Sequence, residues 1–259
     1  MRVISIIVMG LVLLGAGVGV AQAQTAAPPG GSPLVVPQVT IGVGQANSPD
    51  QVSTAVKLLL LIAVLALAPS FILMLTSFTR IVVVLSFLRQ ALGTNQTPTN
   101  QIVLGLSLFL TVFIMFPVWT QIHQTAVKPY MAQQIGYEEA FTRAMAPLRA
   151  FMLKQTREKD LGLFMKVSHQ PRPQNVNDVP TWVIAPAFMI SELRTAFMIG
   201  FMIWLPFLIV DMVISSILMS MGMLMLPPIM ISLPFKLLVF VLADGWYLLV
   251  GSLVNSFGV

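Results

Sequence analysis

The chain has 259 residues, of which 57% are hydrophobic and only 9% are charged, and its formal net charge is +5. A soluble domain carries about 25% charged residues. So few charges cannot cover, in water, the core that this length would form, which predicts burial in lipid or among partner proteins. The basic residues are spread thinly, so nucleic acid is not an expected partner. Cysteine is absent, which excludes disulfides, thiolate metal sites and cysteine nucleophiles.

Residues 1–23 have the three-part pattern of a secretory signal peptide: a positive start, an apolar run and a small-x-small cleavage site at Ala21 to Ala23. The alternative is an uncleaved first membrane helix. The Pro/Gly-rich stretch at 27–33 favours cleavage, because it offers nothing that would pack on such a helix. Residues 24–54 are then a flexible periplasmic lead-in.

Residues 55–122 predict a first helical hairpin. Its first arm begins at Ala55 and is apolar for about 20 residues, which matches a hydrocarbon core of roughly 30 Å. The apolar pattern then continues until Gly93, a natural helix terminator. Such an arm is too long for one span, so it either bends at Pro69 or packs in part against protein. Arg80 and Arg89, inside the apolar pattern, favour packing.

The second arm of this hairpin is predicted over 102–119, with Pro117 and Trp119 marking its end. Residues 123–184 differ in kind, because they hold eight Lys/Arg and five Asp/Glu. They predict a small helical domain whose apolar stripes suffice for partner contacts but not for a core of its own. One helix opens at Glu138 and Glu139 and is interrupted by Pro147, which begins a second helix. A third short helix begins near Asp160.

Residues 185–259 predict a second apolar hairpin, with arms at about 186–219 and 229–255. The connection at 222–228 is irregular backbone at membrane depth, which is tolerated only where protein surrounds it or where it lines a cavity. A cleaved signal places 123–184 outside the cytoplasm, whereas the positive-inside tendency points the other way. That tendency weakens for loops of about 60 residues or more, so the signal peptide decides the orientation.

No catalytic motif is present: the sequence lacks GxxxxGK[ST], HExxH and G-x-S-x-G, and its two histidines are isolated. We expect no enzyme, no cofactor and no metal site. The charges inside apolar stretches are more informative, because an unpaired charge at membrane depth costs at least about 2.5–3.5 kcal/mol. Asp211 and Lys236 lie on different arms and are predicted to pair, within the chain or between subunits. In one interpretation they are a functional pair at a water-filled pathway or at a boundary between subunits. In the other they only mark the aqueous ends of the arms.

Glu192 and Arg194 are two residues apart, so they point to different helix faces and each is expected to reach another element. Methionine is dense around 219–225, with 17 in the chain. Flexible thioether side chains on the 222–228 connection could form a deformable apolar constriction that excludes ions. The alternative is ordinary packing.

Several long motifs resemble the FliP family of flagellar type III export gate proteins. They are LTSFTRI at 75–81, RQALGTNQ at 89–96, Arg149 to Asp160, PAFMISELRTAF at 186–197, LPFKL at 233–237 and DGW at 244–246. The resemblance covers nearly all of residues 55–257. It implies an all-α integral membrane protein whose two long helical hairpins flank a small helical periplasmic domain. It further implies an oligomeric helical export gate in the bacterial inner membrane and flagellar basal body, with a substantial periplasmic part.

The same resemblance implies partners and site residues. About five copies would assemble with two small membrane partners (the Q and R components), larger export-gate membrane proteins and the basal-body ring, and unfolded flagellar proteins would pass through. The family's methionine gasket falls on Met223, Leu224 and Met225, with Leu where relatives often carry a third Met. Glu192, Asp211 and Lys236 occupy its functional charged positions. Phe151 and Phe164 fall in the domain that relatives use for ring contacts.

Three alternatives remain open. A virulence secretion homologue would share fold and mechanism but not cargo, and its branch usually lacks a long cleavable signal. A proton or solute transporter would use Asp211 and Lys236 as a relay, against which the scarcity of buried carboxylates argues. A purely structural scaffold would tolerate bulky apolar replacements at the Met223 connection.

Overall fold

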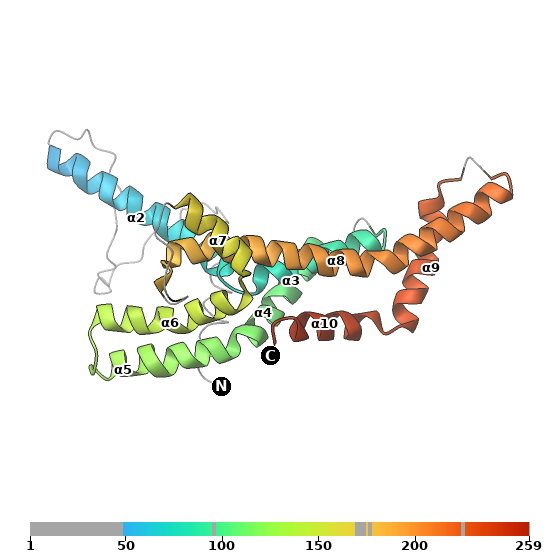
Figure 1. Cartoon of the computed structure of the whole chain (residues 1–259). Coiled ribbons are helices and arrows are strands. Elements are labelled where there is room, and N and C mark those ends of the chain that lie inside the picture. The colour runs from blue at the N-terminus through green and yellow to red at the C-terminus, as the bar shows by residue number, and fades with distance from the viewer. Residues whose placement is uncertain (1–48, 95–96, 169–174, 176–177, 224–225, 259) are drawn as a thin grey trace, which may run out of the picture. The chain divides into compact units, whose positions relative to one another are not determined.

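The computed structural model describes residues 49–94, 97–168, 175, 178–223 and 226–258, and every regular element in these ranges is a helix (Figure 1). The predicted signal peptide and residues 24–48 of the predicted lead-in lie outside the described residues. Val52–Val259 form one compact unit. The all-α prediction is therefore confirmed for the part of the chain that the structure describes.

The helices follow one another along the chain as α2 (Pro49–Met74), α3 (Phe78–Ala91), α4 (Asn100–Ile122), the π-helix η1 (His123–Val127), α5 (Lys128–Met131), α6 (Tyr137–Gln155), α7 (Glu158–Val167), α8 (Thr181–Ser220), α9 (Pro228–Leu242) and α10 (Gly245–Asn255). Among the described residues, three stretches could cross a membrane by length and composition: Val56–Met74, Asn100–Met131 and Thr181–Ser220. A fourth is the pair α9 and α10, if this bent pair counts as one span. The apolar stretch of α2 is uncovered by the rest of the protein along its length, as expected of a helix made for an apolar solvent.

The first arm divides into two helices. α2 begins at Pro49 rather than at Ala55, and it continues through Pro69. The break comes instead at 75–77, after which α3 runs alongside α8 with its apolar face buried. The packing alternative is thus confirmed, and the helix is not interrupted at Pro69. Gly93 ends the arm as predicted, in the left-handed conformation with φ +74°.

The sequence analysis predicted that two helices end at a proline, but in the structure both helices continue. α4 extends through Pro117 to Ile122 and leads into η1 and α5, and α6 is one helix through Pro147. A proline removes one backbone hydrogen bond and crowds the preceding turn. Packing offsets that cost here, because α6 lies against α4, η1 and α8. The predicted starts near Glu138 and Asp160 agree with α6 and α7 to within two residues.

The last hairpin has one continuous and one broken arm. α8 is unbroken for 40 residues, roughly 60 Å, about twice the thickness of a hydrocarbon core. The predicted single arm 229–255 is wrong, because α9 and α10 meet at an angle of 65°. Asp244 adopts the left-handed conformation at the bend, with φ +50°. Gly245 follows because a Cβ there would lie 2.2 Å from the Phe240 ring.

Among the described residues, two apolar clusters join α3, α4 and the later helices. The larger joins α3, α4, α8 and the α9–α10 arm, and its fully buried members include Ile81, Val84, Ala196 and Leu253. The smaller joins α6 and α7 to the first turns of α8, around Met152 and Phe188. Partly buried Phe151 packs against both clusters, so the polar segment and the apolar hairpins share a continuous interior.

Close contact between α3 and α8 depends on Gly200. A Cβ there would lie 2.7 Å from the Phe87 ring, so Gly200→Ala forces the two helices apart. We expect a loss of about 1–3 kcal/mol in the free energy of unfolding, measured by circular dichroism in mild detergent. The control is Gly105→Ala on α4, where nothing lies within 4 Å. That change should be neutral or slightly stabilising, and equal effects of the two would contradict this packing.

Candidate functional site

A buried arginine lies in the first turn of α3. Arg80 is only 1% exposed, although it is one of the longest and most polar side chains of the protein. A guanidinium out of water is costly unless its charge is paired and its N–H groups are bonded. Arg80 meets both requirements, because all five of its N–H groups have acceptors.

The partners of Arg80 come from three other parts of the chain. Its Nε donates to Oε2 of Glu192 at 2.8 Å, and Nη2 donates to the other oxygen of that carboxylate, giving a bidentate pair. Nη1 donates to the carbonyl oxygen and the hydroxyl of Ser256, at 3.0 and 2.9 Å. Nη2 also donates to Gln155 Oε1 at 3.0 Å. One cation thus joins α3, α8, the end of α6 and the residues after α10.

An aromatic ring closes this site. The Arg80 guanidinium carbon lies 3.8 Å from the centre of the Phe257 ring, a cation–π contact. Phe257 in turn stacks on Phe151, with 6.4 Å between centroids, and its carbonyl accepts from Gln155 Nε2. We call Arg80, Glu192, Gln155, Ser256 and Phe257 the arginine hub.

A smaller network holds α7 beside the hub. Asp160 accepts hydrogen bonds at Oδ2 from Arg157 and from the buried Ser191 hydroxyl, both at 2.6 Å. The Arg157 amide donates to the same hydroxyl at 3.1 Å. Ser191 immediately precedes Glu192, so the two networks meet on one turn of α8 and bind α6 and α7 to the apolar hairpin.

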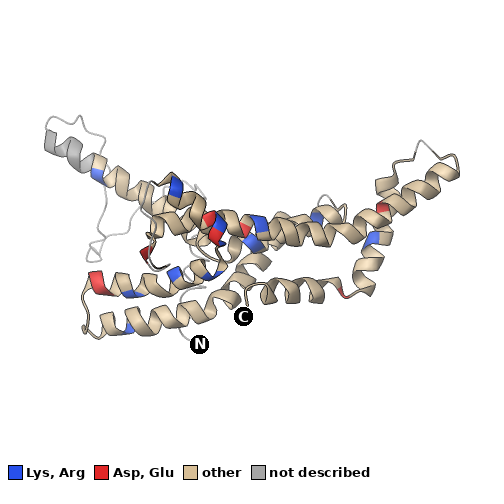
Figure 2. Ribbon diagram, viewed as in Figure 1, with Lys and Arg blue, Asp and Glu red and all other residues tan. Residues whose placement is uncertain are grey.

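A second ion pair joins α8 to α9. Lys236 Nζ lies 2.6 Å from Asp211 Oδ2, and it also donates to the Ala91 carbonyl at 3.2 Å, at the last residue of α3. The Ser232 hydroxyl donates to the other Asp211 oxygen at 2.6 Å. Figure 2 shows the acidic and basic segments facing each other where α8 meets α9. Lys236 is buried, whereas the Asp211 side chain is about one-third exposed. We call Lys236, Asp211, Ser232 and the Ala91 carbonyl the lysine clasp.

Two predictions about charge are confirmed. Asp211 pairs with Lys236, within the chain, and Glu192 reaches another helix rather than Arg194. Arg194 itself is exposed and forms no ion pair among the described residues. The functional role of these four residues stays a prediction.

Sequence reasoning singled out Arg80 but missed three of the residues that contact it. Gln155, Ser256 and Phe257 are ordinary residue types, and they lie 75 to 177 positions from Arg80. The one signal in the sequence was general: a buried charge such as that of Arg80 needs a partner.

The predicted gate residues are described only in part. Met223 lies just after α8 in the connection to α9 and is 39% exposed, while Leu224 and Met225 lie outside the described residues. Phe151 and Phe164 are partly buried in the smaller apolar cluster of their own chain. Their part in an assembly interface, like the gate, stays a prediction.

Comparison with known proteins matches the model of the FliP family over residues 61–253, which include both ion pairs but not Ser256 and Phe257 of the hub. The chain belongs to the FliP family. A flagellar biosynthetic protein FliP of Bacillus subtilis is 54% identical over 84% of this chain and 98% of its own length. The protein of that name in Pectobacterium carotovorum is 51% identical over 82% of each chain, and that of Caulobacter vibrioides 48% over 85% and 83%.

The hub makes the stability of this FliP protein sensitive to single changes. Arg80→Met leaves the Glu192 carboxylate buried without its counter-charge, and we expect a loss of about 3–5 kcal/mol. The double variant R80M/E192M removes both charges and should lose less than R80M alone. Arg143→Met, which breaks an exposed ion pair with Glu139, should change stability by less than about 1 kcal/mol. Unfolding in mixed detergent micelles measures all three, and a double variant as unstable as R80M would contradict this account.

Proposed function

We propose that this chain is a pore-forming component of the flagellar type III export gate in the bacterial inner membrane. About five copies, joined by the small Q and R components, would conduct unfolded flagellar proteins through an apolar constriction. The observation that carries this proposal is the family match over residues 61–253, with relatives named for flagellar biosynthesis. Long apolar helices and a shortage of charge support a membrane location.

The geometry suggests how the chain would serve as a passive conduit. α3 and α8 form a rigid spine, tied at one end by the hub and at the other by the lysine clasp. The clasp lies on the hairpin of α8 and α9, whose connection carries Met223. A fixed hairpin with flexible apolar side chains at its connection suits a seal that yields to a passing chain and closes again.

The geometry of the clasp argues against a proton or solute relay. Lys236 is held by Asp211 and by a backbone carbonyl, an arrangement that stabilises charge in place. If the pair were a relay, this chain alone in vesicles should take up protons or solute. The larger gate proteins and the basal-body ring remain the proposed partners of the periplasmic face, with Phe151 and Phe164 near it. A virulence secretion homologue is the second candidate, and cargo distinguishes it.

The clasp is tested by export in the host. A strain without this gene is complemented with the wild-type chain, Asp211→Asn or Asp244→Asn, and hook and filament proteins in the medium are assayed with swimming. Asp211→Asn leaves the buried lysine with no counter-charge, so export should fall at least tenfold, whereas exposed Asp244 tolerates the change. Membrane levels of each variant serve as the control. Normal export in the deletion strain would remove the flagellar assignment.

The proposed seal is tested by ion leakage. Met223→Ala and Met225→Ala together remove the flexible side chains, and we expect a severalfold rise in ion conductance of membranes containing the assembled gate. Met202→Ala, at an exposed position on α8, is the matched control and should leave conductance unchanged. Leakage equal to wild type in the double variant would refute the gate and favour a scaffold.

A further inference from the structure

α4, η1 and α5 form one arm of a helical hairpin, and α6 forms the other (Figure 1). We call the closed end of this hairpin, residues 128–146, the tip. Residues 127–151 are all described and none of them is buried, whereas Ala126 and Met152, on either side of this stretch, are 2% and 0% exposed. The tip contributes no side chain to either apolar cluster. Packing therefore holds it less firmly than the rest of the hairpin.

The polar contacts of the tip are local as well. Within the described part of the chain, its side-chain hydrogen bonds stay in the first turns of α6, where Thr142 donates to the Glu138 carbonyl and Arg143 to the Glu139 carboxylate. Bonds from α6 side chains to other segments begin only at Arg149, after the tip has ended. A segment with few buried contacts and only local bonds moves at a low cost in free energy.

Both arms of the hairpin lose a backbone hydrogen bond at the same level. Proline has no N–H, so Pro129 cannot donate to the carbonyl of Thr125, four residues before it. In the same way, Pro147 cannot donate to the carbonyl of Arg143. Thr125 also lies in η1, and π-helical turns are rare and occur frequently at functional sites. Each arm thus has one weak point in its backbone.

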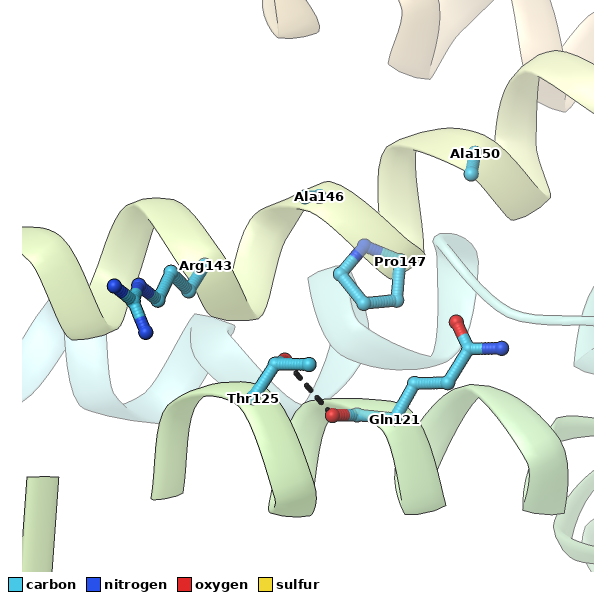
Figure 3. A pocket seen from close by; sticks show the side chains of 6 residues that line it. All are labelled: Gln121, Thr125, Arg143, Ala146, Pro147 and Ala150. Atoms are coloured by element: carbon cyan, nitrogen blue, oxygen red, sulfur yellow. Dashed lines mark hydrogen bonds between the residues drawn. The ribbon is translucent and has the colours of Figure 1, made fainter. Parts of the chain in front are cut away.

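These weak points face each other across a recess of about 500 Å³ (Figure 3). Thr125 lies on one wall, and Arg143 and Pro147 lie on the other, beside the small side chain of Ala146. The hydrogen bond drawn in Figure 3 stays within one arm, since the Thr125 hydroxyl donates to the Gln121 carbonyl at 2.8 Å. None of the hydrogen bonds between the described residues that line the recess crosses it.

We propose that the tip turns as one unit about a hinge formed by η1 and Pro147. Helices bend sharply where proline or a π-turn interrupts the regular hydrogen bonds, and interruptions at one level let both arms bend together. The recess gives room for this motion. The hub and the clasp lie outside the tip, so the frame stays fixed while the tip moves. The motion changes the position of exposed apolar side chains such as Met131 and Tyr137. It stands on the fold alone and does not depend on the proposed function.

Distances between spin labels test the hinge directly, because the chain has no cysteine of its own. In the full chain in mild detergent, one labelled pair joins Gln134→Cys in the tip to Lys159→Cys on α7. The control pair joins Lys159→Cys to Met198→Cys on α8, and all three positions are exposed. Double electron–electron resonance should give a distance distribution about twice as broad for the tip pair as for the control pair. Equal widths would overturn the proposal.

The position of the hinge is tested by restoring the missing donors. Pro129→Ala and Pro147→Ala together should narrow the tip distribution to the width of the control pair. The matched control is Pro117→Ala, at an exposed position of α4 between the buried Met115 and Val118, and it should leave the tip distribution as broad as in the wild type. A double variant as broad as the wild type would overturn the proposal, because the tip would then move about another point.

Hydrogen exchange of the unsubstituted chain provides a measurement that no variant affects. α6 is one continuous helix, so without a hinge its protection should change smoothly along its length. With the hinge, the amides of residues 141–146 should exchange about tenfold faster than those of residues 150–155. Equal protection on the two sides of Pro147 would also overturn the proposal.

Discussion

A buried guanidinium with five bonded N–H groups is the constraint on which the rest of this structure depends. Arg80 occupies the first turn of α3, where the helix dipole alone disfavours a cation. The Glu192 carboxylate compensates its charge, while Gln155 and Ser256 accept the remaining hydrogen bonds. Because these partners come from separate helices, satisfying one side chain fixes how α3, α6, α8 and the end of the chain meet.

At the C-terminal end of α3 the helix dipole favours a cation, and a cation is bound there. The carbonyl of its last residue, Ala91, lies at the negative end of the helix dipole, and Lys236 donates to it while pairing with Asp211. One short helix thus anchors both ends of the bent α9–α10 arm: Lys236 at one end and Ser256 with Phe257 at the other. The 65° bend lies between these anchors, at Asp244. Such a frame fixes the position of α9 against α8.

Hydropathy predicted most helices here because an apolar environment demands long apolar segments, and it also predicted that Asp211 and Lys236 need partners. The rule that proline ends a helix failed at Pro117 and Pro147, because packing against neighbouring helices offsets the hydrogen bond that proline removes. Hydropathy failed at the broken arm 229–255, whose bend depends on backbone conformation at Asp244. The hub's partners could not be read from the sequence, because Arg80 and Ser256 are 176 residues apart and serine carries no signal of burial.

Two kinds of contact with the surroundings follow from this frame. α2 presents apolar side chains to its surroundings from Val56 onward, whereas the first turns of α6 expose the charged side chains of Glu139 and Arg143. The hub lies between them and joins the apolar hairpins to the polar segment.

Hydrogen–deuterium exchange of the full chain in mild detergent tests the central claim most directly. If the hub fixes the end of the chain, the amides of Ser256, Phe257 and Gly258, which are hydrogen-bonded, should exchange as slowly as those in the middle of α8. In Glu192→Gln, they and the last turn of α6 should lose protection together, while the middle of α4 keeps it. Rapid exchange at 256–258 in the wild type, or no change in the variant, would contradict the account.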